Sequence, residues 1–112
     1  MHQHFLLNKP YGYLSQFISN DKKEKNKKFL GELYDFPLKI MAVGRLELKS
    51  EGLLLLTTDG QLSSRITSSS VEKEYYVQVN GDITQDAIIN LREGVAIGFA
   101  GKKYITKSCR VE

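Results

Sequence analysis

The stretch that decides the fold of this chain is Gly44-Arg45-Leu46-Glu47-Leu48-Lys49-Ser50-Glu51-Gly52-Leu53-Leu54-Leu55-Leu56-Thr57-Thr58-Asp59-Gly60. Its apolar run predicts a buried strand over residues 53–57, because the run is short and is bounded by Gly52 and by an Asp-Gly turn. Asp59 is a suitable cap for a following helix, since its carboxylate can accept hydrogen bonds from free backbone N–H groups. We expect that helix over residues 61–67, where apolar residues recur four apart.

Outward from this stretch, local patterns predict a mixture of strands and helices. Further strands are expected at residues 4–8, 13–17, 40–43, 75–79 and 103–111. Helices are expected at residues 29–35 and 85–93, the second capped by Thr84 and ended by Gly94. Strands and helices alternate without regular βαβ units, which indicates the α+β class.

Composition limits the function classes. The chain has 112 residues, a net charge of +3 and a pI near 9.0, which suits one domain and is compatible with a polyanionic partner. No apolar run approaches the roughly 20 residues that span a bilayer, so we expect no membrane partner and a cytoplasmic location. Cys109 is the single cysteine, and His2 and His4 have no further ligands near them, so we expect no disulfide and no metal.

The densest charge in the sequence is a lysine run within residues 22–28. Such runs are usually solvated loops, and a loop that faces RNA is the alternative.

The quoted stretch resembles the central motif of the pseudouridine synthases that modify ribosomal RNA, in which GRLD is followed by two variable residues and [ST]EGLLLLTNDG. Residues 7–15 resemble the first motif of that family, a strand followed by KPxG, and residues 73–77 resemble its K-x-Y-x-V motif. The three segments occur in the family's order. The resemblance implies a mixed, largely antiparallel sheet with flanking helices. It also implies that residues 1–112 are the N-terminal part of a catalytic domain of the large-subunit type without an S4 domain.

The resemblance further implies the isomerisation of a uridine in ribosomal RNA with no metal or organic cofactor. The family's catalytic aspartate corresponds to Glu47, the base-stacking tyrosine to Tyr75, and the arginine that holds the flipped nucleotide and pairs with the carboxylate to Arg45. We expect RNA contacts from Lys9, Arg45 and Lys73. From the residues alone, Arg45 and Glu47 could equally be a surface ion pair worth under about 1 kcal/mol.

Two departures from the family qualify this expectation. Glu47 carries one methylene more than aspartate, and a misplacement of about 1 Å can cost on the order of 100-fold in rate. The family's late EGRNRQVRRM-like segment has no counterpart in the sequence, which indicates either a truncated chain or one completed by a second polypeptide. We therefore expect self-association or a partner chain at an open sheet edge, and no measurable turnover by this chain alone. A non-catalytic RNA-binding relative and a remnant without function stay as alternatives.

Overall fold

The computed structural model describes residues 1–18 and 26–112, and it confirms the α+β class. The chain divides into two compact units, Met1–Lys73 and Glu74–Glu112. That both units belong to one catalytic domain stays a prediction. Among the described residues, no helix has the length and apolar character needed to cross a membrane.

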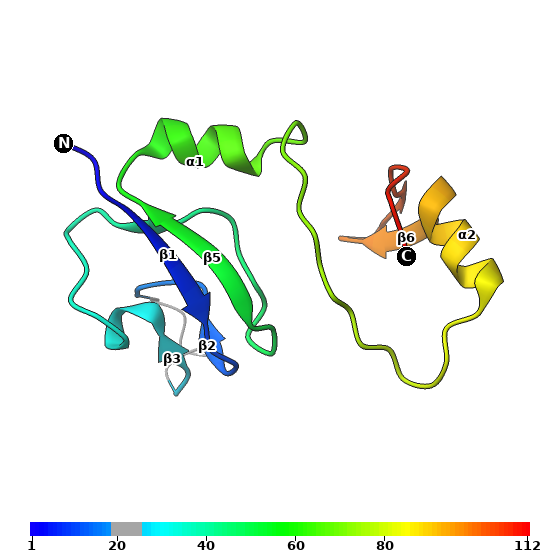
Figure 1. Ribbon diagram of the computed structural model, residues 1–112, viewed down its shortest axis with the longest axis horizontal. Helices are drawn as coiled ribbons and strands as arrows, with labels where there is room; N and C mark the ends of the chain where they lie inside the picture. Colours follow the sequence, from blue (N-terminus) through cyan, green and yellow to red (C-terminus); the bar gives the residue numbers. More distant parts are fainter. Residues whose placement is uncertain (19–25) are drawn as a thin grey trace. The chain divides into compact units, whose positions relative to one another are not determined.

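The first unit is built on a three-stranded antiparallel sheet (Figure 1). Strand β5 (Gly52–Thr57) lies between β1 (His4–Lys9) and β4 (Met41–Ala42). Alternate residues of a strand point to opposite faces, and β5 buries Leu54 and Leu56 on the core face, where they meet Leu30. The predicted strands at residues 4–8 and 53–57 are therefore confirmed, and the one at 40–43 is present in shortened form.

The segment between β1 and β4 differs most from expectation within this unit. Only residues 13 and 14 form a strand, β2 (Tyr13–Leu14), which pairs in parallel with β3 (Lys28–Phe29). The helix predicted at residues 29–35 is wrong, because a single 3₁₀ turn, η2 (Leu30–Glu32), stands there. Tertiary packing decides this geometry, since the ring of Phe36 contacts those of Phe5, Phe17 and Tyr34 at centroid distances of 5.2–5.5 Å.

Helix α1 (Gly60–Thr67) follows β5 directly, as predicted. Asp59 caps it, because a carboxylate oxygen of Asp59 accepts hydrogen bonds from the backbone N–H groups of Gln61 (3.0 Å) and Leu62 (3.4 Å). Such a cap is worth about 1 kcal/mol.

The second unit holds helix α2 (Gln85–Glu93) and a hairpin of β6 (Ala96–Phe99) and β7 (Lys102–Ile105). The helix and its Thr84 cap are as predicted, and Gly94 follows it with φ +120°. A side chain at Gly94 would also collide with the carbonyl oxygen of Thr106, so only glycine fits there. The strand predicted at residues 103–111 is confirmed only as far as Ile105.

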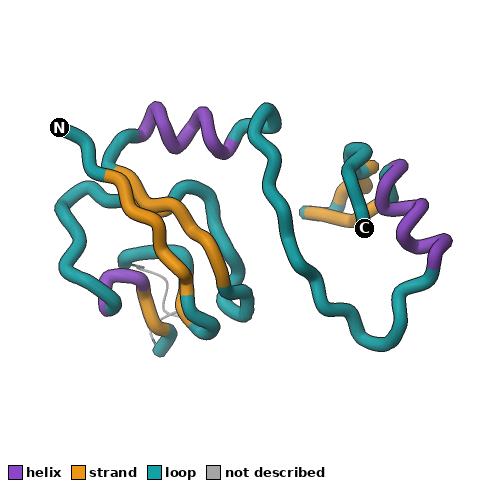
Figure 2. Tube along the Cα trace, in the orientation of Figure 1, coloured by secondary structure: helices purple, strands orange, loops and turns teal. Residues whose placement is uncertain are grey.

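The strand predicted at residues 75–79 is absent. These residues follow an irregular path with exposed side chains (Figure 2), and none of residues 74–82 makes a hydrogen bond to another described residue. A strand requires a partner for its backbone N–H and C=O groups, and the described part of the chain supplies none. The alternating sequence is typical of a strand, but β propensity alone does not make one.

Candidate functional site

The central motif forms a loop between β4 and β5 whose residues alternate in exposure. Arg45, Glu47, Lys49 and Glu51 are exposed, whereas the residues between them are half-buried. Leu46 packs against the core cluster. The buried positions therefore anchor the loop to the first unit, and Glu47 lies in a loop on the exposed side, as expected.

Hydrogen bonds from the first motif hold this loop in place. The Ser15 hydroxyl donates to the Leu46 carbonyl oxygen at 2.6 Å and accepts from the Leu46 N–H at 2.9 Å. The Gly12 N–H donates to the Leu48 carbonyl oxygen at 2.8 Å. The backbone of Leu46 and of Leu48, the two neighbours of Glu47, is thus held by residues more than 30 positions earlier, so the backbone that carries the carboxylate is preorganised.

Lys9 also connects the two motif loops through hydrogen bonds, and the expectation that it contacts RNA is wrong. Its side chain is fully buried, at 0% exposure, and its ammonium donates to the carbonyl oxygens of Pro10 (3.0 Å) and Ser50 (2.7 Å). Burial lowers the pKa of the Lys9 ammonium below its ordinary value, and the Glu51 carboxylate partly opposes that shift. Lys9 therefore joins the two motif loops, and its ammonium is not exposed for contact with an RNA phosphate.

Gly44 starts the loop with φ +73°. This left-handed conformation costs a residue with a side chain roughly 1 kcal/mol or more, whereas glycine adopts it freely. It redirects the chain out of β4, so that Arg45 and the residues after it run along the first motif.

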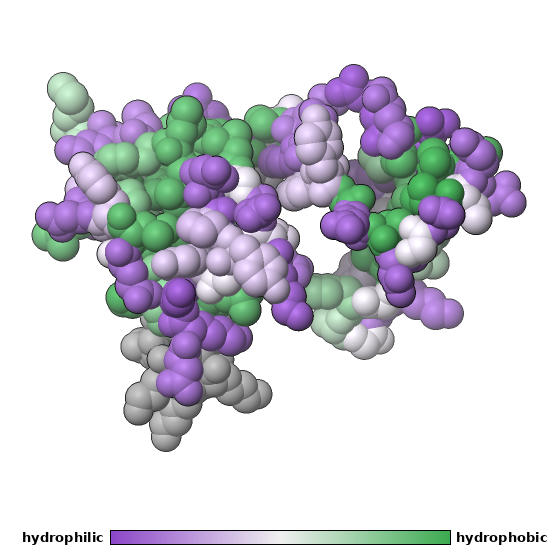
Figure 3. Space-filling view, turned by 60° about the horizontal axis from the view of Figure 1, so that its bottom comes forward, coloured by the Kyte–Doolittle hydropathy of each residue, from purple (hydrophilic) through white to green (hydrophobic). Residues whose placement is uncertain are grey.

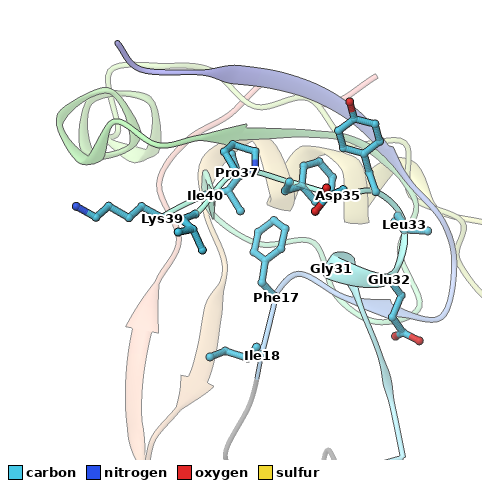
Figure 4. A pocket seen from close by; sticks show the side chains of 12 residues that line it. Phe17, Ile18, Gly31, Glu32, Leu33, Asp35, Pro37, Lys39 and Ile40 are labelled. Carbon is cyan, nitrogen blue, oxygen red and sulfur yellow. The ribbon is translucent and has the colours of Figure 1, made fainter.

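The surface beside Glu47 is hollowed. A hollow of about 330 Å³ is lined by residues 14–16 of the first motif and residues 45–48 of the central motif. A larger one, of about 750 Å³, lies over the aromatic segment after β3. Figure 4 shows Phe17 pointing toward Pro37 in this larger hollow, with Lys39 and Glu32 directed away from each other. The smaller hollow is the better candidate site, because Arg45 and Glu47 line it and none of the motif residues lines the larger one.

The remaining predicted residues lie elsewhere. No ion pair joins Arg45 to Glu47 within residues 1–18 and 26–112. Lys73 is exposed at the end of the first unit, and its ammonium donates to the carbonyl oxygens of Ser68 and Val71, both at 2.7 Å. Tyr75 belongs to the second unit and is 63% exposed.

Most of the lysine run lies outside the described residues. Lys27 and Lys28 are described and exposed. The Lys28 ammonium lies 5.5 Å from the centre of the Tyr13 ring, within the range of a cation–π contact.

Comparison with known proteins identifies the family to which this chain is similar. Residues 3–108 match the family model described as RNA pseudouridylate synthase. Ribosomal large subunit pseudouridine synthase E of Xanthomonas axonopodis pv. citri (strain 306) is 46% identical over 94 residues, which cover 82% of this chain and 48% of that protein. Ribosomal small subunit pseudouridine synthase A of Haemophilus influenzae is 36% identical over 114 residues, covering 98% of this chain and 46% of that protein.

A solved structure is similar to this chain in fold as well as in sequence. The crystal structure of a pseudouridylate synthase superposes with a TM-score of 0.76 at 34% identity, covering 96% of this chain and 45% of that one. The chain therefore belongs to the RNA pseudouridylate synthase family. It spans less than half the length of these relatives.

Sequence reasoning missed Ser15 as part of the site. It belongs to the first motif, but serine gives no local signal of a contact with a residue 31 positions later. The alternating exposure of the central loop had a signal in the sequence, because its charged residues stand at every second position from Arg45 to Glu51.

Proposed function

We propose that this chain is the N-terminal part of the catalytic domain of an enzyme that isomerises a uridine of ribosomal RNA to pseudouridine. Its branch would be that of the large-subunit enzymes without an S4 domain. The observation that carries this proposal is the exposed carboxylate of Glu47 beside Arg45, on a loop whose backbone is fixed on both sides and which borders a hollow.

We assign one role to each residue of the proposed site. Glu47 is the catalytic carboxylate, and proteins use Asp and Glu in covalent catalysis. Arg45 holds the flipped nucleotide through its phosphate, because a guanidinium can bind phosphate oxygens through two N–H groups. Tyr75 stacks on the displaced base, as aromatic side chains do with unstacked RNA bases. The reaction requires such flipping, because a stacked base shields its glycosidic bond, and we propose no metal or organic cofactor.

RNA affinity is expected to come from exposed cations. Arg45, Lys73 and the described end of the lysine run, Lys27 and Lys28, are all exposed. Phosphate contacts make binding salt-dependent, with a slope that grows with the number of phosphates neutralised. Titration with a ribosomal RNA fragment at two ionic strengths tests this: Arg45→Ala should weaken binding and reduce the slope by about one. Binding that salt does not affect would contradict it.

The catalytic proposal is tested with four proteins: the 112-residue chain and its Glu47→Asp variant, each alone and each fused to the remaining half of the Xanthomonas relative. Pseudouridine formation in ribosomal RNA is measured for all four. We expect no measurable turnover by the chain alone, little or none with Glu47→Asp alone, weak turnover by the fusion, and the most by the fused Glu47→Asp variant. A Glu47→Gln fusion should be inactive, and turnover by it would remove Glu47 from the catalytic role.

A non-catalytic RNA-binding protein is the second candidate, favoured by the glutamate at position 47. It predicts salt-dependent RNA binding in all four proteins and no turnover in either fusion, so the same experiment separates the two.

Association and location complete the proposal. Strand β1 is at the edge of its sheet, and a free edge can recruit another strand. We therefore propose that the chain associates with a second copy or with another chain that completes its sheet. A protein that acts on ribosomal RNA works where ribosomes are assembled, so we propose a cytoplasmic location.

A further inference from the structure

The turn that follows β1 is fixed to the loop that carries Glu47. The register of the sheet sets the end of β1 opposite the start of β5, so both segments lie at the same end of the sheet (Figure 1). The Gly12 N–H donates to the Leu48 carbonyl oxygen at 2.8 Å, which joins the turn to the residue directly after Glu47. The buried ammonium of Lys9 supplies a second connection, because it donates to a carbonyl oxygen of each segment. The backbone of the turn is therefore preorganised, like that of the loop.

Tyr11 stands at the tip of this turn, and its side chain is 60% exposed. Consecutive Cα atoms are about 3.8 Å apart and hydrogen-bonded segments about 5 Å apart, so the Cα atoms of Tyr11 and Glu47 lie within about 13 Å of each other across the bond from Gly12 to Leu48. This is the span of a few nucleotides, since stacked nucleotides of one strand are about 3.4 Å apart. Tyr11 can therefore meet a nucleotide close to the one that reaches Glu47.

Exposed cations lie in the loop against which the turn is held. Arg45 and Lys49 are both exposed. Figure 3 brings this end of the sheet forward and shows strongly polar residues (purple) beside weakly polar ones (pale purple) on the surface of the first unit. Proteins that bind single-stranded RNA combine cations that meet the phosphates with aromatic rings on which bases stack. The turn and the loop together supply both kinds of group.

We propose that the ring of Tyr11 stacks on an unpaired RNA base that flanks the target uridine. The turn after β1 is then a second base-binding position beside Glu47, and it takes a base of any identity, since every base has a π-face. It requires only that this base is unpaired, because an aromatic side chain cannot stack on a base held within a helix. This inference rests on the proposed function for its RNA substrate, and it does not depend on turnover.

The other two tyrosines of the first unit are less suited to this role. Tyr34 is 62% exposed, but its ring packs on other rings, with centroids 5.2 Å from that of Phe36 and 6.2 Å from that of Phe5. It also lines the larger hollow, away from the motif loops. Tyr13 is half-buried, and the Lys28 ammonium already lies over its ring. Tyr34 therefore serves as a control of matched exposure.

Titration of the full chain with two RNA probes tests the proposal. One probe is a ribosomal RNA hairpin with uridine in its single-stranded loop, and the other is the same RNA annealed to its complement. Tyr11→Leu should weaken binding to the hairpin about fivefold or more, because stacking contributes about 1–3 kcal/mol per base. It should leave the salt slope unchanged, since no phosphate contact is lost. Tyr11→Phe keeps the ring and should bind like the wild-type chain.

Two controls separate stacking from other causes. Tyr34→Leu should leave the affinity for the hairpin unchanged, and Tyr11→Leu should leave the affinity for the fully paired RNA unchanged. Denaturant unfolding verifies that each variant is folded. An equal loss with Tyr34→Leu, an equal loss on paired RNA, a loss with Tyr11→Phe as large as with Tyr11→Leu, or a reduced salt slope with Tyr11→Leu would overturn the proposal.

The outcomes also distinguish this proposal from the proposed function. If the chain binds no RNA at low salt, the RNA substrate and the role of Tyr11 fail together. If Arg45→Ala reduces the salt slope while Tyr11→Leu changes nothing, only the role of Tyr11 fails. The same Tyr11 variants in the fusion with the Xanthomonas half should show the same loss, and a loss that disappears there would overturn the proposal, because the other half would then cover the ring.

Discussion

The loop at residues 44–51 and the segment at residues 74–80 differ in how far their sequence predicts an ordered backbone. The loop is not a strand, yet its backbone is tied to the first motif at Leu46, Leu48 and Ser50. The segment has strong β propensity, yet no hydrogen bond holds it among the described residues. In this molecule the backbone is ordered where its N–H and C=O groups have hydrogen-bond partners. The β propensity of a segment contributes only where such partners are present.

The ordered backbone of the loop also bears on its function. A preorganised backbone suits a catalytic carboxylate, because small displacements of the reacting group are costly.

The largest effect should come from breaking the core on which the loop rests. Leu56 is 1% exposed in β5, so Leu56→Ala should lower the free energy of unfolding by about 2–5 kcal/mol, through lost burial and a cavity. Leu53→Ala, at an exposed position of the same strand, is the matched control and should change it little. Denaturant unfolding measures both, and equal losses would show that β5 is not oriented as described.

The second test concerns Ser15. Ser15→Ala would leave both the N–H and the C=O of Leu46 without their side-chain partner, at a cost of about 1–3 kcal/mol. Hydrogen exchange at the Leu46 amide should accelerate, while the core amides of β5 should change less. Ser64→Ala, at an exposed position of α1, controls for the loss of a hydroxyl. Unchanged exchange at Leu46 would mean that Ser15 does not hold the loop.

Sequence could predict those parts of the molecule that have local causes. The caps at Asp59 and Thr84 and the stop at Gly94 depend on neighbours within a few residues, and both helices were predicted from them. The short 3₁₀ turn η2 depends on aromatic contacts between distant segments, and the helix expected there was wrong.

The candidate site also has some features with local causes and others that depend on residues far away in the sequence. The exposure of Arg45 and Glu47 follows from a local alternation of charged and apolar residues. The burial of Lys9 depends on a carbonyl group 41 positions away, and lysine is rarely buried, so local reasoning assigned it to RNA instead.

The smallest effect should be a pH dependence that comes from Lys9. Its pKa is lower in the folded chain than in the unfolded one, chiefly because burial removes the ammonium from water. Between those two pKa values the unfolded chain binds more protons, so stability should rise with pH as the ordinary lysine pKa is approached from below. At lower pH both states are protonated, and the cost of the buried charge is constant.

Lys9→Met should remove this rise, and the difference in unfolding free energy between the wild-type chain and the variant should therefore grow as the pH approaches the ordinary lysine pKa of about 10.4 from below. Taking the difference cancels the titration of the tyrosines and of the other lysines. Lys49→Met removes one exposed charge from the same loop and controls for the change in net charge. If the difference in unfolding free energy does not change with pH, the Lys9 ammonium is hydrated in the folded chain. Only the hydrogen bonds of Ser15 and Gly12 would then connect the two motif loops.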